Sequence, residues 1–95
     1  MKDVRKMPKY KCRKEVHALK IVEIVYDVNV AYREKRESDG SAMLISDEFA
    51  PVRVSYEFIK ANDPKPGGYY VVYDGGYKSF SPAYAFESAY TKLFD

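Results

Sequence analysis

The sequence predicts an α+β domain in which two short helices pack on one face of an antiparallel β-sheet built from two hairpins. Three features support this prediction: an alternating β-branched stretch in the first third of the chain, a tyrosine-rich hairpin in the last third, and a helical segment after each. The elements are expected in the order ββ(β)α-ββα. The 95 residues, 46% of them hydrophobic, suit one small globular domain. We expect residues 1–8 to be a disordered basic leader and residues 9–95 to form that domain.

The first predicted strand is long, covering residues 10–32, and we expect a bend in it. Its side chains largely alternate between apolar and polar, which is typical of a half-buried strand. The residues expected on its apolar face are Val22, Ile24, Tyr26, Val28 and Val30. Residues 33–41 are polar and end in an Asp-Gly turn, so residues 42–46 are predicted to return as the partner strand. The charged tip is either ordinary solvated surface or a functional loop.

The middle of the chain is predicted to contain a short strand and a helix. Pro51 interrupts the extended piece, so residues 52–54 are expected at a sheet edge or in a short link. Ser55 then suits the cap of a helix that runs to about Ala61, with Glu57 in its first turn. The link that follows contains two prolines and two glycines, which cannot continue a helix.

The second hairpin is predicted from residues 69–73 and 77–80, joined by Asp74-Gly75-Gly76. A two-residue turn places one set of alternating side chains on one face, namely Tyr69, Val71, Tyr73, Lys78 and Phe80. A three-residue loop exchanges the partners on the second strand, and the sequence fits both. The last helix is expected to start with Ser81 as its cap and Pro82 as its first residue. Its predicted apolar stripe is Ala83, Phe86, Tyr90 and Leu93.

Charge is concentrated at the start of the chain, although the formal net charge is only +2. Residues 1–14 contain seven basic residues and one acidic residue, whereas the rest of the chain is net acidic. A basic N-terminal segment of this kind binds nucleic acid when lysines neutralise phosphates and an aromatic ring stacks on a base. The candidate nucleic-acid-binding residues are Arg5, Lys6, Lys9, Tyr10, Lys11, Arg13 and Lys14. The alternative is a solvated leader beside an exposed strand edge.

Several kinds of chemistry are not expected from this sequence. Cys12 and His17 are too few to hold zinc, and in an extended strand they point to opposite faces, which excludes a Cys–His nucleophilic pair. The sequence has no nucleophile elbow, phosphate-binding loop or dinucleotide fingerprint. We therefore expect no enzyme activity, no metal and no cofactor. The apolar runs are short and the first residues lack a secretory signal, so we expect a cytoplasmic location.

The segment from Pro66 to Glu87 resembles a group of small bacteriophage and prophage proteins. Its Gly-Tyr-Tyr hairpin, its Ser-Pro helix start and the motif Phe86-Glu87-Ser88-Ala89-Tyr90 carry the resemblance, together with the basic strand start Lys9-Tyr10-Lys11-Cys12. The resemblance implies a phage origin and a location in the host cytoplasm. It implies no catalytic or binding residues. Residues 27–50 depart from the group, and their charged insertion is a candidate for a partner-specific role.

These exclusions and the resemblance together predict a non-enzymatic protein that binds a host or phage protein. Inhibition of a host defence or regulatory complex is one example, and nucleic-acid binding or a self-associating structural role are the alternatives. The chain contains ten tyrosines, and tyrosine is enriched in protein interfaces. The contact residues expected to be exposed are Tyr70, Tyr77 and Tyr84. For Tyr70 and Tyr77, cross-strand packing or a place in the core is the alternative.

Overall fold

The computed structural model describes residues 16–90 and confirms the α+β class. The described strands are β1 (His17–Lys20), β2 (Glu23–Tyr26), β3 (Ala42–Ile45), β4 (Val52–Val54), β5 (Tyr69–Val72) and β6 (Lys78–Ser81). The described helices are α1 (Asp27–Glu34), α2 (Tyr56–Asn62) and α3 (Ala83–Ala89). The predicted leader, residues 1–8, and the rest of the basic N-terminal segment, residues 9–14, lie outside the described residues.

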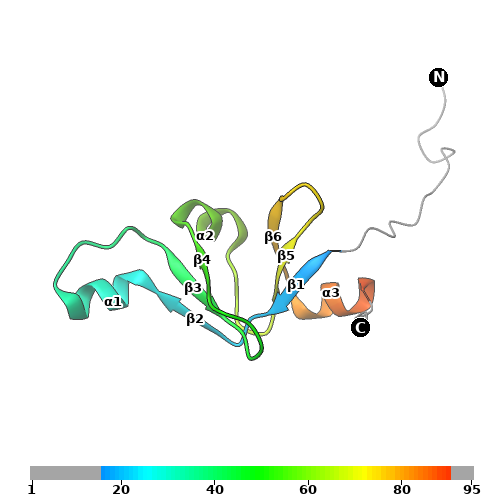
Figure 1. Cartoon of the computed structure of the whole chain (residues 1–95), viewed down its shortest axis with the longest axis horizontal. Helices are drawn as coiled ribbons and strands as arrows, with labels where there is room; N and C mark the ends of the chain where they lie inside the picture. The colour runs from blue at the N-terminus through cyan, green and yellow to red at the C-terminus, as the bar shows by residue number, and fades with distance from the viewer. Residues whose placement is uncertain (1–15, 91–95) are drawn as a thin grey trace, which may run out of the picture.

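Two three-stranded antiparallel sheets replace the single sheet expected from the sequence. One sheet has the order β1-β5-β6 and the other the order β2-β3-β4. They diverge from the bend between β1 and β2, which are the two halves of one strand (Figure 1). At the bend the N–H of Ile21 donates to the carbonyl of Gly68 at 2.8 Å, and the N–H of Val22 donates to the carbonyl of Ile45 at 2.8 Å. Two adjacent residues therefore tie one strand to both sheets.

With β1 and β2 counted as one strand, the connectivity is that of an open five-stranded OB-type barrel. The first half of this strand pairs with β5 and its second half with β3. No ladder joins β4 to β6 among the described strands, so the barrel is open at that side. Many unrelated functions occur on one fold, and this connectivity alone assigns none of them.

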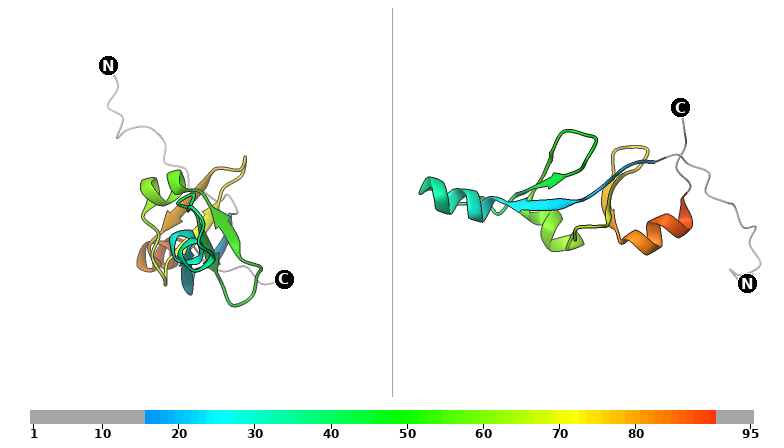
Figure 2. Two further views of the ribbon diagram at one scale, coloured as in Figure 1. Left: turned by 90° about the vertical axis from the view of Figure 1, so that its left-hand side faces the viewer. Right: turned by 90° about the horizontal axis from the view of Figure 1, so that it is seen from below.

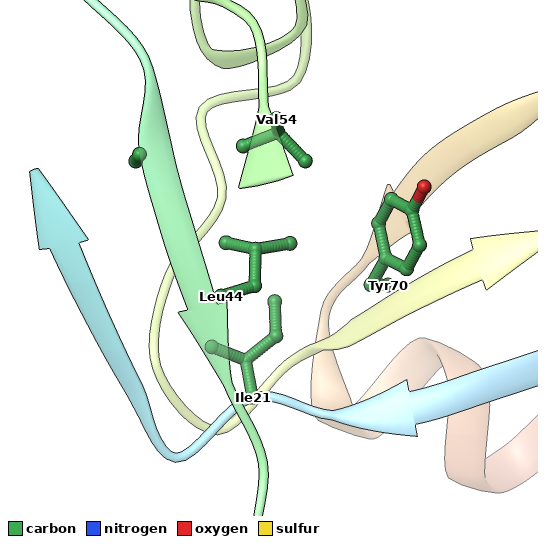
Figure 3. Close-up of a cluster of buried hydrophobic side chains, with 5 residues drawn as sticks. Ile21, Leu44, Val54 and Tyr70 are labelled. Atoms are coloured by element: carbon green, nitrogen blue, oxygen red, sulfur yellow. The ribbon is translucent and has the colours of Figure 1, made fainter. Parts of the chain in front are cut away.

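The core lies where the two sheets diverge. Figure 3 shows Ile21, Leu44, Val54 and Tyr70 directed toward one another from the bend, β3, β4 and β5. Ile21 and Leu44 are completely buried, and Tyr70 retains only 5% of its exposure. The Tyr70 ring also meets the edge of Phe58 from α2, with the centroids 5.7 Å apart. α2 therefore covers the gap between the sheets with an aromatic contact.

The prediction of a strand through residues 27–32 is wrong, because the chain forms α1 there. The N–H of Asp27 donates to the carbonyl of Ser41 at 2.8 Å, which ends the β2–β3 ladder. Beyond that point Val28, Ala31 and Tyr32 have the 3- and 4-residue spacing of a helix, and only Ala31 is buried. The predicted bend and the returning strand over residues 42–45 are confirmed.

The predicted edge strand at residues 52–54 and the helix after Ser55 are confirmed. The hydroxyl of Ser55 accepts a hydrogen bond from the N–H of Phe58 at 3.1 Å, which makes Ser55 the cap. α3 starts one residue later than expected. Ser81 pairs with Tyr69 in the β5–β6 ladder, so Pro82 takes the cap position and Ala83 is the first helical residue.

The β5–β6 hairpin has the three-residue loop. The N–H of Tyr73 donates to the carbonyl of Tyr77 at 2.8 Å, and Gly76 donates back to Tyr73 at 2.9 Å. Tyr70 is therefore opposite Phe80, and both belong to the face that packs on the core. The other face is covered by α3, where the rings of Tyr69 and Phe86 stack at 4.2 Å. Both faces of β5 are thus occupied within the chain.

Gly68 occupies a position that no larger residue fits. A Cβ there would overlap the Phe80 ring and come within 2.9 Å of the carbonyl oxygen of Ser81. We predict that Gly68→Ala lowers the free energy of unfolding by about 1 to 3 kcal/mol, the usual cost of forcing an extra carbon into a packed site. Urea unfolding followed by circular dichroism measures it. Adding Phe80→Leu should make the Gly68→Ala cost smaller, and an unchanged cost in that background would contradict the clash.

Candidate protein-binding surfaces

The three tyrosines expected to be exposed do not form one surface. Tyr77 is 69% exposed and Tyr84 is 79% exposed, as expected. The expectation for Tyr70 is wrong, because the three-residue loop turns this side chain into the core between Phe80 and Phe58. Tyr77 lies in the β5–β6 loop and Tyr84 in the first turn of α3, at the opposite end of β6 (Figure 1). Two separate exposed tyrosines remain from the expected set.

The β5–β6 loop presents an aromatic pair. The rings of Tyr73 and Tyr77 are 5.7 Å apart, and Tyr73 is 36% exposed. Gly75 and Gly76 both have φ of +91°, which lets the loop close in three residues and hold the two rings together. This tip is a compact apolar contact point on an otherwise polar loop.

A second surface is the arm, which we define as residues 27–41. Its helix α1 projects away from both sheets (Figures 1 and 2). Val28 is 58% exposed and Tyr32 is 86% exposed. The two residues are four apart and therefore lie on one side of the helix. The arm therefore exposes an apolar ridge to solvent.

Polar contacts hold the arm in place. The Arg36 guanidinium donates to both carboxylate oxygens of Asp27, at 2.8 and 3.1 Å, and to Glu34 at 2.8 Å. Asp39 accepts from Arg53 of β4 at 2.6 Å and from the N–H of Ser41 at 2.9 Å. These bonds fasten the arm both to itself and to the β2-β3-β4 sheet. The charged tip predicted for residues 33–41 is therefore an ordered network.

This network shifts the pKa values of its two aspartates. The hydrogen bond from Arg36 lowers the pKa of Asp27. Hydrogen bonds from Ser41 and then from Arg53 hold the pKa of Asp39 well below its usual range. A carboxyl whose pKa is depressed in the fold stabilises it above the ordinary value of 3.8 and loses that contribution as pH falls below it. Lowering the pH below 3.8 therefore weakens the hydrogen bonds that hold the arm in place.

A different cluster fastens α3. The Tyr69 hydroxyl donates to Glu87 at 2.7 Å, and Lys20 donates to the same carboxylate oxygen at 3.3 Å. The hydrogen bond to Glu87 raises the pKa of Tyr69, and the bonds from Tyr69 and Lys20 lower the pKa of Glu87. These two contacts make Glu87 an anchor of α3 on the β1-β5-β6 sheet. Its side chain is already engaged within the chain.

An apolar groove of about 270 Å³ opens between the β1-β5-β6 sheet and the loop that joins β3 to β4. The residues that line it are His17, Ala18, Leu19, Phe49, Ala50, Val52, Tyr70 and Val72. Phe49 stands at its edge with 62% exposure. The exposed acids Asp47 and Glu48 precede Phe49 in the same loop. Two exposed acidic residues therefore directly precede a lining residue of this apolar groove.

The remaining expected sites fall partly outside the described residues. These include Cys12 and the whole candidate nucleic-acid-binding set, Arg5, Lys6, Lys9, Tyr10, Lys11, Arg13 and Lys14. His17 is a sheet residue, as expected, paired with Val72. Residues 16–90 contain no group of three or more metal-ligating side chains. None of the helices in this range is long and apolar enough to cross a membrane.

The sequence interpretation missed the residues that carry the two new surfaces. Val28 was placed on a strand, although its spacing to Ala31 and Tyr32 also fits a helix with Asp27 in its first turn. Phe49 is a large apolar residue directly after Ser46-Asp47-Glu48, which is a local signal for an exposed anchor. The groove itself has no local signal, because it is assembled from β1, β4, β5 and the loop after β3.

Comparison with known proteins gives one structural neighbour and no sequence family. No protein-family model and no curated protein matches the chain. The solution structure of the monomeric form of the phage L decoration protein matches with a TM-score of 0.60 and 27% sequence identity. The match covers 96% of this chain and 65% of that chain, so this chain spans about two thirds of its neighbour's length. The similarity supports the expected phage origin.

Tyr70 is buried and Tyr77 is exposed, so the two side chains should contribute differently to stability. Tyr70→Ala should cost about 3 to 5 kcal/mol of unfolding free energy or prevent folding, because it empties an aromatic position in the core. Tyr77→Ala should change stability by less than about 1 kcal/mol, because its ring is mostly in water. Thermal and urea unfolding of the two variants measure this difference. Equal losses would contradict the loop register.

The arm should loosen in acid before the core does. As pH falls below 3.8, protonation of Asp27 and then Asp39 removes the carboxylates that Arg36, Ser41 and Arg53 hold. Amide hydrogen exchange should then speed up in residues 27–41 while the amides of β3 and β5 stay protected. Asp39→Asn should produce faster exchange in the arm already at neutral pH. Arm protection that is unchanged down to pH values where the core unfolds would contradict this prediction.

Proposed function

We propose that this chain is a phage decoration protein, a small non-enzymatic protein that binds the outside of an assembled phage shell. The observation that carries the proposal is the match to the phage L decoration protein, which extends over nearly all of this chain. At 27% identity, the likeness involves sequence as well as fold. Because a third of the neighbour lies outside the match, its other properties are not transferred.

The surface of the chain is suited to such a role. A small domain with several separate exposed aromatic residues can contact a large partner at more than one point. Tyr77 and Tyr84, at the two ends of β6, are our proposed contact residues, and Tyr73 adds a second ring beside Tyr77. A decoration role places the protein on a particle rather than free in the host cytoplasm.

The other functions expected from the sequence have less support. Inhibition of a host defence complex rests on no contact or neighbour described above and stays a prediction. Nucleic-acid binding also stays a prediction, since its candidate residues lie outside residues 16–90. A structural, self-associating role agrees better with a decoration protein as the neighbour.

Binding to assembled shells tests the proposal. The full chain should sediment with empty coat-protein shells of the phage or prophage that encodes it, and the bound amount should saturate. Unassembled coat subunits serve as the control, because a decoration protein is expected to prefer the assembled surface. Cryo-electron microscopy of saturated shells should show added density on the outer surface. Absence of co-sedimentation at micromolar concentrations would overturn the proposal.

Two single variants test the proposed contact residues. We expect Tyr77→Ser or Tyr84→Ser to weaken binding to shells by about tenfold or more, the loss typical of a buried aromatic anchor. The two positions lie at opposite ends of β6, so each variant tests a separate contact. Circular dichroism should show both variants folded. Shell binding that neither substitution changes would exclude the two tyrosines as contacts without affecting the decoration role itself.

A further inference from the structure

We propose that copies of this chain contact one another head to tail, with Tyr32 of one copy seated in the apolar groove of the next. The two surfaces are different parts of the same chain: the ridge of α1 and the groove beside Phe49. The inference does not depend on the decoration role, because both surfaces are described without it. It follows from the matching shape, polarity and charge of the two surfaces.

The ridge formed by Val28 and Tyr32 is held in position although it is exposed. A helix of eight residues is unstable alone in water, yet α1 is fixed by the Asp27–Arg36 pair and the bonds around Asp39. These polar contacts fix α1 without burying the ridge, since Tyr32 is 86% exposed. A side chain that is held in position before binding loses less entropy when a partner covers it. Apolar residues at positions i and i+4 of a helix are the usual anchors for a groove.

The groove offers the complementary shape. Its volume of about 270 Å³ accommodates an aromatic side chain, and its lining includes Leu19, Phe49 and Val72. Phe49 at the edge is 62% exposed and would be covered by an inserted ring. Two exposed apolar surfaces of one molecule, one convex and one concave, can be removed from water by a single contact.

The charged residues beside the ridge and beside the groove have opposite signs, which favours this pairing. Arg33 and Lys35 follow Tyr32 at the outer end of α1, and Asp47 and Glu48 directly precede Phe49, which lines the groove. All four side chains are exposed, and none forms an ion pair with another residue of the range 16–90. Of the acids of the arm, Asp27 and Glu34 are paired with Arg36, and Asp39 is paired with Arg53. These opposite charges favour docking of the basic end of α1 against the loop that carries Asp47 and Glu48.

The position of the arm makes the contact intermolecular. α1 projects on one side of the bend, whereas β1, which lines the groove, runs on the other side (Figure 1). A contact between two different surfaces is heterologous, so repeated copies form a ring when the rotation closes and a filament when it does not. One helix and one groove bury less than the roughly 1,200 Å² of a stable interface, so we expect weak association. Crowding of copies on a common surface strengthens such a contact through effective concentration.

Charge reversal in the full chain tests the pairing. R33E/K35E makes the ridge acidic, and D47K/E48K makes the groove edge basic. Each variant alone should associate at least about tenfold more weakly than the natural chain, because like charges then meet in every contact. An equimolar mixture of the two should regain association, because every ridge then finds an oppositely charged groove. Sedimentation velocity from micromolar to millimolar concentration, at low salt, measures all three.

Controls separate the interface from a folding defect. Tyr32→Ser should also weaken association about tenfold, whereas Tyr84→Ser and Lys60→Glu, which change exposed residues outside both surfaces, should not. Circular dichroism confirms that each variant is folded, and the mixing experiment excludes misfolding because it restores the contact. A natural chain that stays monomeric at millimolar concentration would overturn the inference. So would a mixture that associates no better than its components. Neither result bears on binding to phage shells.

Discussion

The bend at Ile21 and Val22 is the feature on which the rest of the fold depends. Two consecutive N–H groups donate to different sheets, Ile21 to Gly68 and Val22 to Ile45. The strand therefore belongs to both sheets, and the Ile21 side chain is completely buried where they diverge. Leu44 and Tyr70 complete the core from the two sides. A chain this small buries little apolar surface, so one well-packed corner has to supply much of its stability.

The contacts at the bend are long-range, so the sequence could predict only the parts of the fold that local signals determine. Local signals were sufficient for the cap at Ser55, the edge strand after Pro51 and the β5–β6 hairpin. The loop length of that hairpin was not predictable, because the turn dipeptides fit both choices and only packing of Tyr70 against the core decides between them. The division into two sheets depends on long-range pairing and leaves no local pattern.

The arm shows the same limit at a candidate site. Its sequence alternates well enough to suit a strand, but the β2–β3 ladder ends where Asp27 meets Ser41, and none of the described strands pairs with the chain beyond that point. A helix then satisfies the backbone internally, and its polar network with Arg36 and Asp39 replaces a core. Of its helix, only Ala31 is buried. Sequence alternation indicates a strand only where a partner is available.

The tyrosines show why composition alone does not locate an interface. Tyr70 packs in the core, and Tyr69 stacks on Phe86 and donates to Glu87, so both are already committed to the fold. Tyr32 and Tyr77 have mostly exposed rings, on α1 and on the β5–β6 loop. Tyr69 and Tyr70 belong to β5, which directly follows Gly68 at the bend, whereas Tyr32 and Tyr77 lie on segments that project from the sheets (Figure 1). The projecting segments are therefore the parts of this fold that can bind a partner without loss of the core.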